Sequence, residues 1–190
     1  MQTRSNAGPI QYEDEIKVMS HDDFKNHCLK VTHEIDDYCK KNNLRVDYVV
    51  PVLRSGAVPA VYIANELNLI KFAPIQVKKI KQEGVYNHIV LLNSLKELDK
   101  EKELVLLVVE GTYSSGDTVN TALEEIKQTL PKAKILFSTI CIRGKENMPV
   151  NIHKGFYAFD LPREKLFTYP WESADMKENH LDQKLENIYY

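Results

Sequence analysis

The sequence lacks the features that mark membrane, secreted and nucleic-acid-binding proteins. Its longest apolar run, 104–109, is far shorter than the roughly 20 residues that a bilayer span requires, and the N-terminal residues hold no apolar stretch typical of a secretory signal. With 25 Lys plus Arg against 27 Asp plus Glu, the formal net charge is -2, and there is no block of like charges. Such a chain shows no general excess or block of positive charge of the kind that binds nucleic acid or an anionic membrane. We therefore expect a cytoplasmic protein that acts on small molecules and has no nucleic-acid or membrane partner.

Cysteine is scarce as well. The three cysteines, Cys28, Cys39 and Cys141, form no CxxC pair and are odd in number. This pattern indicates neither a disulfide framework nor a zinc site, and we interpret the thiols as reduced core residues. What the sequence does contain is 190 residues with 43% apolar and 27% charged side chains, the profile of one ordinary globular domain.

The order of the apolar segments predicts a three-layer α/β fold with a mostly parallel, twisted sheet flanked by helices. Continuous runs such as LVLLVV are typical of strands buried on both faces of a parallel sheet. Spacings of three and four residues between apolar side chains predict the helices, the first of which has a capping-box-like start at Ser20 and Asp23. We expect helices over 20–42, 58–67 and 117–130, and strands over 48–53, 104–109, 134–142, 156–159 and 166–169.

The remaining segments show no regular spacing of apolar residues over most of their length. Residues 1–19 are polar and without a period, so we interpret them as an N-terminal extension of a domain that covers 20–172, followed by a tail over 173–190. Between Lys78 and Lys102 the chain is polar and poorly periodic except over 89–92. We expect a long mobile excursion there, of the kind that often carries function.

The chemistry is concentrated where the buried strand 104–109 runs into Glu110 and the sequence GTYSSGDT. Small hydroxyl and glycine residues let backbone N–H groups converge on a phosphate, and the N-terminus of the following helix adds partial positive charge. Two other interpretations stay open: a Walker A loop, in which Asp117 would stand at the lysine position, and a Ser- and Gly-rich turn without a ligand. Glu110 argues against the simple turn, because an acidic residue ending so apolar a strand is costly unless it faces a site.

This stretch resembles the fingerprint of the type I phosphoribosyltransferases: four apolar strand residues, two acidic residues, two variable residues, then small residues with Gly and Thr. Three further segments are similar to the same family in the right order. Residues 49–60 (VVPVLRSGAVPA) resemble its pyrophosphate loop, with a candidate cis peptide between Leu53 and Arg54. Residues 137–145 (FSTICIRGK) resemble the base-recognition strand of the bacterial xanthine, guanine and hypoxanthine transferases, and 160–172 (DLPREKLFTYPWE) resemble their C-terminal hood.

The resemblance implies roles for individual residues. Glu110 and Ser114 would stand at the catalytic positions, and Glu172 and Glu110 at the metal positions, with Mg²⁺ as the cofactor. Arg143, Leu166 and Phe167 would contact the base. Phosphoribosyl pyrophosphate would be bound by Arg54, Ser55, Gly56, Glu110, Gly111, Thr112, Tyr113, Ser114, Ser115, Gly116, Asp117 and Thr118.

The sequence departs from the family pattern at four positions. Gly111 replaces the second acidic residue, and Ser114 replaces an aspartate assigned acid/base work beside the purine N7. A serine hydroxyl does not titrate near neutral pH, so that proton transfer would be lost, moved to water or supplied elsewhere. Arg143 stands where a lysine is usual, and Leu166 stands where the hood has its stacking aromatic.

Three functional hypotheses follow from the resemblance. The first is a Mg²⁺-dependent transferase of purine salvage that moves the 5-phosphoribosyl group to a purine base, in particular a 6-oxopurine, and releases pyrophosphate. The second is a weak or inactive protein of this fold that binds phosphoribosyl pyrophosphate or a nucleotide for regulation, motivated by Gly111 and Ser114. The third is transfer of the phosphoribosyl group to or from a non-purine acceptor. Family members commonly self-associate, so a homo-oligomer is expected.

Overall fold

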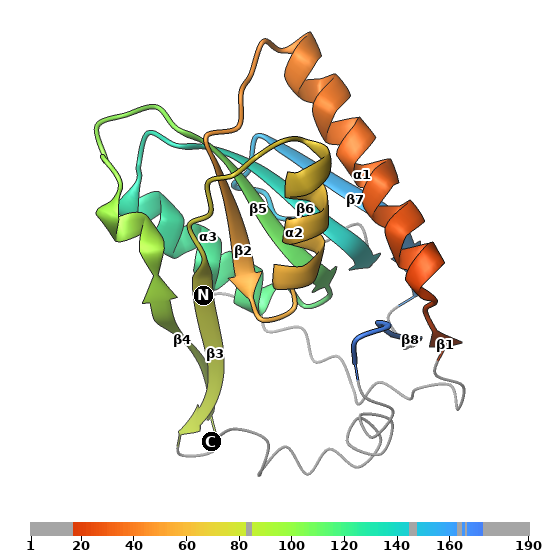
Figure 1. Ribbon diagram of the computed structural model, residues 1–190. Helices are drawn as coiled ribbons and strands as arrows, with labels where there is room; N and C mark the ends of the chain where they lie inside the picture. The colour runs from red at the N-terminus through yellow and green to blue at the C-terminus, as the bar shows by residue number, and fades with distance from the viewer. Residues whose placement is uncertain (1–16, 83–84, 145–147, 163–164, 166, 173–190) are drawn as a thin grey trace. The chain divides into compact units, whose positions relative to one another are not determined.

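The structure, a computed structural model, describes residues 17–82, 85–144, 148–162, 165 and 167–172 (Figure 1). The chain divides into two compact units, one made of residues 1–24 and 162–190 and the other of residues 25–161. The second unit contains the predicted α/β sheet. Within the described ranges, no helix is both long enough and apolar enough to cross a membrane.

The second unit is built on a six-stranded sheet with the order β4-β3-β2-β5-β6-β7. All neighbouring strands run parallel except β3 and β4, which pair antiparallel as a hairpin. Alternation of parallel strands with helices produces this layered architecture. The strands are β2 (Tyr48–Leu53), β3 (Ile75–Gln82), β4 (Val85–Asn93), β5 (Val105–Tyr113), β6 (Lys134–Arg143) and β7 (Lys154–Leu161).

Three α-helices flank the sheet. They are α1 (His21–Lys41), α2 (Ala57–Glu66) and α3 (Asp117–Thr129), and a short 3-10 helix, η1 (Ser94–Glu97), follows β4. Figure 1 shows α3 on one face of the sheet and α1 and α2 on the other. All three α-helices lie within a residue or so of the predicted ranges. Ser20 caps the start of α1 as expected, because the Asp23 N–H donates to Ser20 Oγ at 3.0 Å, and Ser20 Oγ donates in turn to Asp23 Oδ2 at 2.8 Å.

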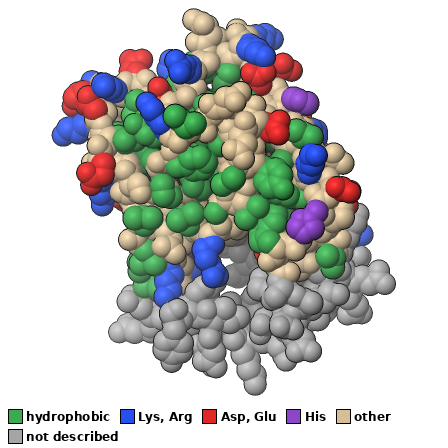
Figure 2. Space-filling view, in the orientation of Figure 1, with side chains coloured by type: hydrophobic (Ala, Val, Ile, Leu, Met, Phe, Trp, Pro, Cys, Tyr) green, Lys and Arg blue, Asp and Glu red, His purple; other side chains and the backbone are tan. Residues whose placement is uncertain are grey.

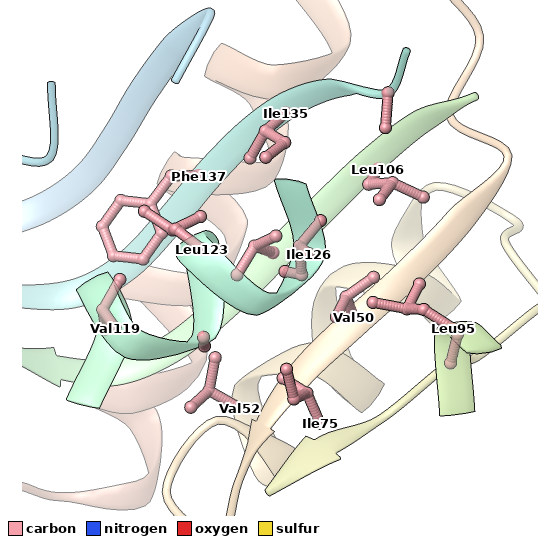
Figure 3. Close-up of a cluster of buried hydrophobic side chains, with 14 of the residues drawn as sticks. Val50, Val52, Ile75, Leu95, Leu106, Val119, Leu123, Ile126, Ile135 and Phe137 are labelled. Carbon is pink, nitrogen blue, oxygen red and sulfur yellow. The ribbon is translucent and has the colours of Figure 1, made fainter. Parts of the chain in front are cut away.

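A large cluster of buried apolar side chains lies between α3 and the sheet (Figure 3). Side chains from the strands meet one face of α3, whose apolar residues recur at spacings of three and four. Burial of each large apolar side chain stabilises the fold by about 1.5–3 kcal/mol relative to exposure. The labelled members in Figure 3 are Val50, Val52, Ile75, Leu95, Leu106, Val119, Leu123, Ile126, Ile135 and Phe137.

The outer side of α2 is apolar too. Val61 and Tyr62 are 49% and 40% exposed, and Figure 2 shows apolar side chains gathered across the face of the molecule on which α2 lies. Exposed apolar surface of this kind is compatible with a protein contact. Self-association stays a prediction.

Two sequence-based predictions about the strands were wrong. The expected excursion over 78–102 contains most of the β3–β4 hairpin, in which Lys79 stacks on the Tyr86 ring at 4.4 Å. Such pairing is decided by cross-strand contacts rather than by periodicity along the chain. The strand predicted to end at Val109 continues to Tyr113, because β5 keeps its pairing with β6 as far as the pair Tyr113 and Ile142. Glu110 to Tyr113 are therefore strand residues, not loop residues.

In the first unit, the two described ends of the chain pair with each other. β1 (Lys17–Val18) lies parallel to β8 (Phe167–Thr168), and the Met19 N–H donates to the Thr168 carbonyl at 3.0 Å. Tyr169 and Trp171 stack at 4.6 Å between ring centroids, and Phe24 packs edge-on against Trp171 at 4.5 Å. Residues 1–16 and 173–190, the bulk of the predicted extension and all of the tail, lie outside the described residues.

Candidate functional site

The carboxyl ends of β2, β5 and β6 bring three of the predicted segments to one edge of the sheet. β2 and β5 pair in parallel up to Pro51 and Val109, and β5 and β6 pair up to Tyr113 and Ile142. The loop after β2, the loop after β5 and Arg143 therefore follow directly from neighbouring strands. In an open parallel sheet, this edge is where ligands bind.

The loop after β2 is packed tightly against β5. Its Leu53–Arg54 peptide is cis, as the family resemblance implied. The Gly56 N–H donates to the Val52 carbonyl at 2.9 Å, and a Cβ on Gly56 would lie only 2.1 Å from the Val109 carbonyl oxygen. No side chain fits between two backbones at that distance, so glycine is required for this close approach. Arg54 itself is exposed at the sheet edge.

Glu110 is buried, with 4% of its surface exposed. Its Oε1 accepts hydrogen bonds from Ser55 Oγ and, at 2.7 Å, from the Gly111 N–H. Burial raises the pKa of Glu110 to about 7, although these two hydrogen bonds act to lower it. The carboxyl group is thus held by the protein and sits at the boundary between its neutral and charged forms near pH 7.

Gly111 is enclosed by neighbouring backbone and side chains. Its carbonyl oxygen accepts a hydrogen bond from Thr139 Oγ1 at 2.9 Å, and a Cβ on Gly111 would lie 3.0 Å from the Ser55 carbonyl oxygen. Sequence reasoning missed Thr139 as part of this edge. The sequence does carry a signal, since Ser138 and Thr139 are a polar pair with apolar residues on both sides, ILF before them and ICI after them.

The loop from Ser114 to Thr118 turns β5 into α3. Gly116 has φ +83°, the left-handed conformation that favours glycine, and it caps the helix without a side-chain hydrogen bond. The first N–H groups of α3 are unbonded within the helix, which is the basis of anion binding at a helix N-terminus. Asp117 accepts a hydrogen bond from Ser115 Oγ at 3.0 Å. Ser114, Thr112 and Thr118 are half-buried beside these groups.

The side chain of Tyr113 lies in the core rather than in the loop. Its side chain is 2% exposed and packs edge-on against Phe137 in the core, at 5.5 Å between ring centroids. Its hydroxyl interacts with the side chain of Asn120, a residue that the sequence did not single out. The ring of Tyr113 therefore packs in the core, while its backbone ends β5 beside the loop.

Arg143 ends β6 one position beyond the pair formed by Tyr113 and Ile142. Its Nε and Nη2 are buried and have no hydrogen-bond partner among the residues that the structure describes. Leaving such groups unpaired costs about 1–3 kcal/mol or more. Buried donors of this kind call for an acceptor, and the planar guanidinium fork suits a ligand with two neighbouring acceptors.

The hood residues belong to the other unit. Glu172 closes a tight turn, because its Oε2 accepts from the Tyr169 N–H at 2.8 Å and its own N–H donates to the Tyr169 carbonyl at 3.0 Å. Phe167 lies in β8, and nothing further is described of its side chain. Leu166 lies outside the described residues.

The two carboxylates proposed for Mg²⁺ differ in how well they fit that role. Glu172 keeps one oxygen, Oε1, without a described partner, and hard carboxylate oxygens are what Mg²⁺ takes from proteins alongside phosphates and waters. Glu110 fits less well, because it is buried, its Oε1 is engaged twice, and its pKa is raised to about 7. Within the described ranges, no cluster of three or more His, Cys, Asp or Glu residues is able to hold a metal ion.

A cavity of about 410 Å³ adjoins the loop after β5. Its described lining comes from the start of α3 and the segment 148–151, with Tyr113 and Ser115 at the loop side. Arg54, Glu110 and Arg143 do not line it, so this cavity is not where the three charged residues of the sheet edge meet.

No protein-family model matches the chain. Solved structures similar to it include a purine phosphoribosyltransferase from Pyrococcus horikoshii OT3, with 20% identity and a TM-score of 0.66 over 83% of this chain and 93% of that chain. A hypothetical protein from Neisseria gonorrhoeae with bound ppGpp has 15% identity and a TM-score of 0.70 over 88% and 96%. The xanthine-guanine-hypoxanthine phosphoribosyltransferase of Helicobacter pylori has 14% identity and a TM-score of 0.63 over 88% and 99%. The chain therefore has the type I phosphoribosyltransferase fold, as its sequence motifs predicted.

Proposed function

We propose that the protein is a phosphoribosyltransferase that transfers the 5-phosphoribosyl group from phosphoribosyl pyrophosphate to a purine base, in particular a 6-oxopurine. One observation carries this proposal. The Arg54–Gly56 loop, the Ser114–Thr118 loop and Arg143 follow three neighbouring parallel strands and share one edge of the sheet. Pyrophosphate, 5-phosphate and base are the three parts of the reacting pair that such groups would bind.

The reaction depends on the positioning of its two substrates more than on covalent catalysis by the protein. The loop over 114–118 would bind the 5-phosphate through backbone N–H groups and hydroxyls at the start of α3. Arg54 would neutralise the departing pyrophosphate, and Glu110 would accept hydrogen bonds from the ribose hydroxyls as the sugar gains oxocarbenium character. Arg143 would donate from its two unpartnered nitrogens, Nε and Nη2, to the 6-oxo edge of the base.

Mg²⁺ is proposed as the cofactor, with Glu172 as the residue that would hold it. When bound, the ion supplies charge stabilisation for the pyrophosphate leaving group. Glu172 would contribute the oxygen that its turn with Tyr169 leaves available.

The test is an assay of nucleotide and pyrophosphate formation from phosphoribosyl pyrophosphate and Mg²⁺, with hypoxanthine, guanine, xanthine, adenine and orotate offered separately. Equal formation of nucleotide and pyrophosphate with a 6-oxopurine supports the proposal. Arg54→Ala is expected to abolish turnover, whereas Arg45→Ala, an exposed arginine before the opposite end of β2, serves as the matched control and should not. No product from any base would exclude the enzyme activity.

A second candidate is favoured by a specific set of observations. Gly111 and Ser114 replace two carboxylates of the family pattern, Glu110 is held by Ser55 and Gly111, and one similar structure contains ppGpp. Together these favour a protein of this fold that binds phosphoribosyl pyrophosphate or a guanine nucleotide as a signal, without turnover.

Thermal shift and calorimetry separate the two candidates. Saturating phosphoribosyl pyrophosphate, GMP or ppGpp is expected to raise the melting temperature if the site binds it, since ligand at 100 times its Kd stabilises a protein by about 2.7 kcal/mol. Binding without any nucleotide product supports the regulatory candidate. Turnover at ordinary enzyme rates, on the order of 1 s⁻¹ or more, would exclude it.

A further inference from the structure

Ser55 and Gly111 lie directly against each other, and one of them is among the positions where the sequence departs from the family pattern. A Cβ added to Gly111 would lie 3.0 Å from the Ser55 carbonyl oxygen and 3.3 Å from the Ser55 Cβ. The Ser55 hydroxyl donates to Glu110 Oε1, which also accepts from the Gly111 N–H. These three residues form one contact between the loop after β2 and the end of β5, called here the Ser55–Glu110–Gly111 contact.

We propose that Ser55 is a positioning residue that orients the Glu110 carboxylate, and that residue 111 is glycine because the Ser55 backbone occupies the space beside it. As far as it concerns ribose binding, this inference rests on the proposed function. Glycine at position 111 is then explained by the close packing of β5 against the loop after β2, rather than by the loss of a carboxylate from a working site.

The hydrogen bonds explain how the orientation is achieved. Both bonds described for the Glu110 carboxylate fall on Oε1, one from the loop after β2 and one from β5 itself. A carboxylate anchored through one oxygen presents the other, Oε2, in a defined direction, and Oε2 is the oxygen available to accept from a sugar hydroxyl. Charge-assisted bonds of this type are stronger than neutral ones and hold a buried carboxylate in place.

The packing explains why a carboxylate at position 111 would not improve the site. Its Cβ would press on the Ser55 backbone, which is held in turn by Gly56 against the Val109 carbonyl. A second negative charge would also lie beside buried Glu110, and a like charge disfavours ionisation of both groups. Restoring the family residue at this position should therefore weaken the site.

The experiment compares the wild-type protein with Ser55→Ala, Gly111→Asp and Gly111→Ala, and uses Ser94→Ala in η1 as a serine control away from the contact. The pKa of Glu110 is measured without ligand, by NMR titration of protein with ¹³C-labelled glutamate. Affinity for phosphoribosyl pyrophosphate with Mg²⁺ is measured by calorimetry. The milder Gly111→Ala keeps the packing test available should Gly111→Asp fail to fold.

Ser55→Ala is expected to raise the pKa of Glu110 further, because it removes a bond that lowers this pKa, and to weaken binding by about tenfold. Gly111→Asp and Gly111→Ala are expected to bind more weakly than wild type and to melt at lower temperature. An unchanged Glu110 pKa in Ser55→Ala, or tighter binding by Gly111→Asp, would overturn the inference. If the wild-type protein binds no phosphoribosyl pyrophosphate, the proposed function fails, while the ligand-free titration and the melting temperatures still decide the role of Ser55 and Gly111.

Discussion

Replacing Glu110 with glutamine should make the protein more stable than wild type above neutral pH. The folded protein holds this carboxyl with a pKa of about 7, against an ordinary value of 4.5, because the group is buried. Between pH 4.5 and about pH 7 the folded state keeps a proton on Glu110 that the unfolded state has lost, so the free energy of unfolding falls as pH rises. At about 1.4 kcal/mol for each pKa unit, the loss amounts to about 3 kcal/mol once the pH exceeds 7. Glutamine cannot ionise and therefore escapes this loss, while its Oε1 still accepts from Ser55 and Gly111.

The assay is thermal unfolding of both proteins at pH 5 and pH 8, without ligand. Most of the loss of about 3 kcal/mol occurs between these two pH values. For a chain of this size, a change of about 1 kcal/mol in the free energy of unfolding moves the melting temperature by about 2–4 °C. The melting temperature of Glu110→Gln minus that of wild type should thus increase by about 5–10 °C from pH 5 to pH 8. Glu103→Gln, which changes an exposed carboxylate, is the control. The same difference at both pH values would refute the assignment of a raised pKa to buried Glu110.

Three further outcomes are expected. Gly116→Ala should lower stability by about 1–3 kcal/mol, because φ is +83° and the new Cβ would lie 2.4 Å from Tyr113 Oη; a melting temperature equal to that of wild type would contradict this. Arg143→Met should leave the ligand-free melting temperature unchanged or higher, since two unpartnered buried nitrogens are removed, yet abolish the response to 6-oxopurines in thermal shift. Cys28 and Cys141, whose pKa burial raises to about 12, should resist iodoacetamide at pH 8 in the native protein, as mass spectrometry of the labelled chain will show.

The central strands and helices could be predicted from the sequence because their signals are local. A run such as YVVPVL is continuously apolar and bounded by turn residues, and β2 forms over the predicted residues. The apolar period and the Ser20 cap likewise placed α1. The order of these elements, together with the loops that follow β2 and β5, was enough to predict the fold and the edge of the sheet that carries the candidate site.

Tertiary structure alone decided how the side chains at that edge meet. Ser55 and Glu110 are 55 positions apart, and their hydrogen bond exists only because β2 and β5 pair in one register. The same pairing brings the Ser55 carbonyl oxygen to 3.0 Å from where a Cβ on Gly111 would lie, and the Tyr113 side chain is buried in the core. The spacing of apolar residues in the sequence indicates only local structure. The register between paired strands depends instead on the contacts made along the whole length of both strands. The sequence by itself thus determined the elements and their order, and the strand register decided the chemistry of the residues that they carry.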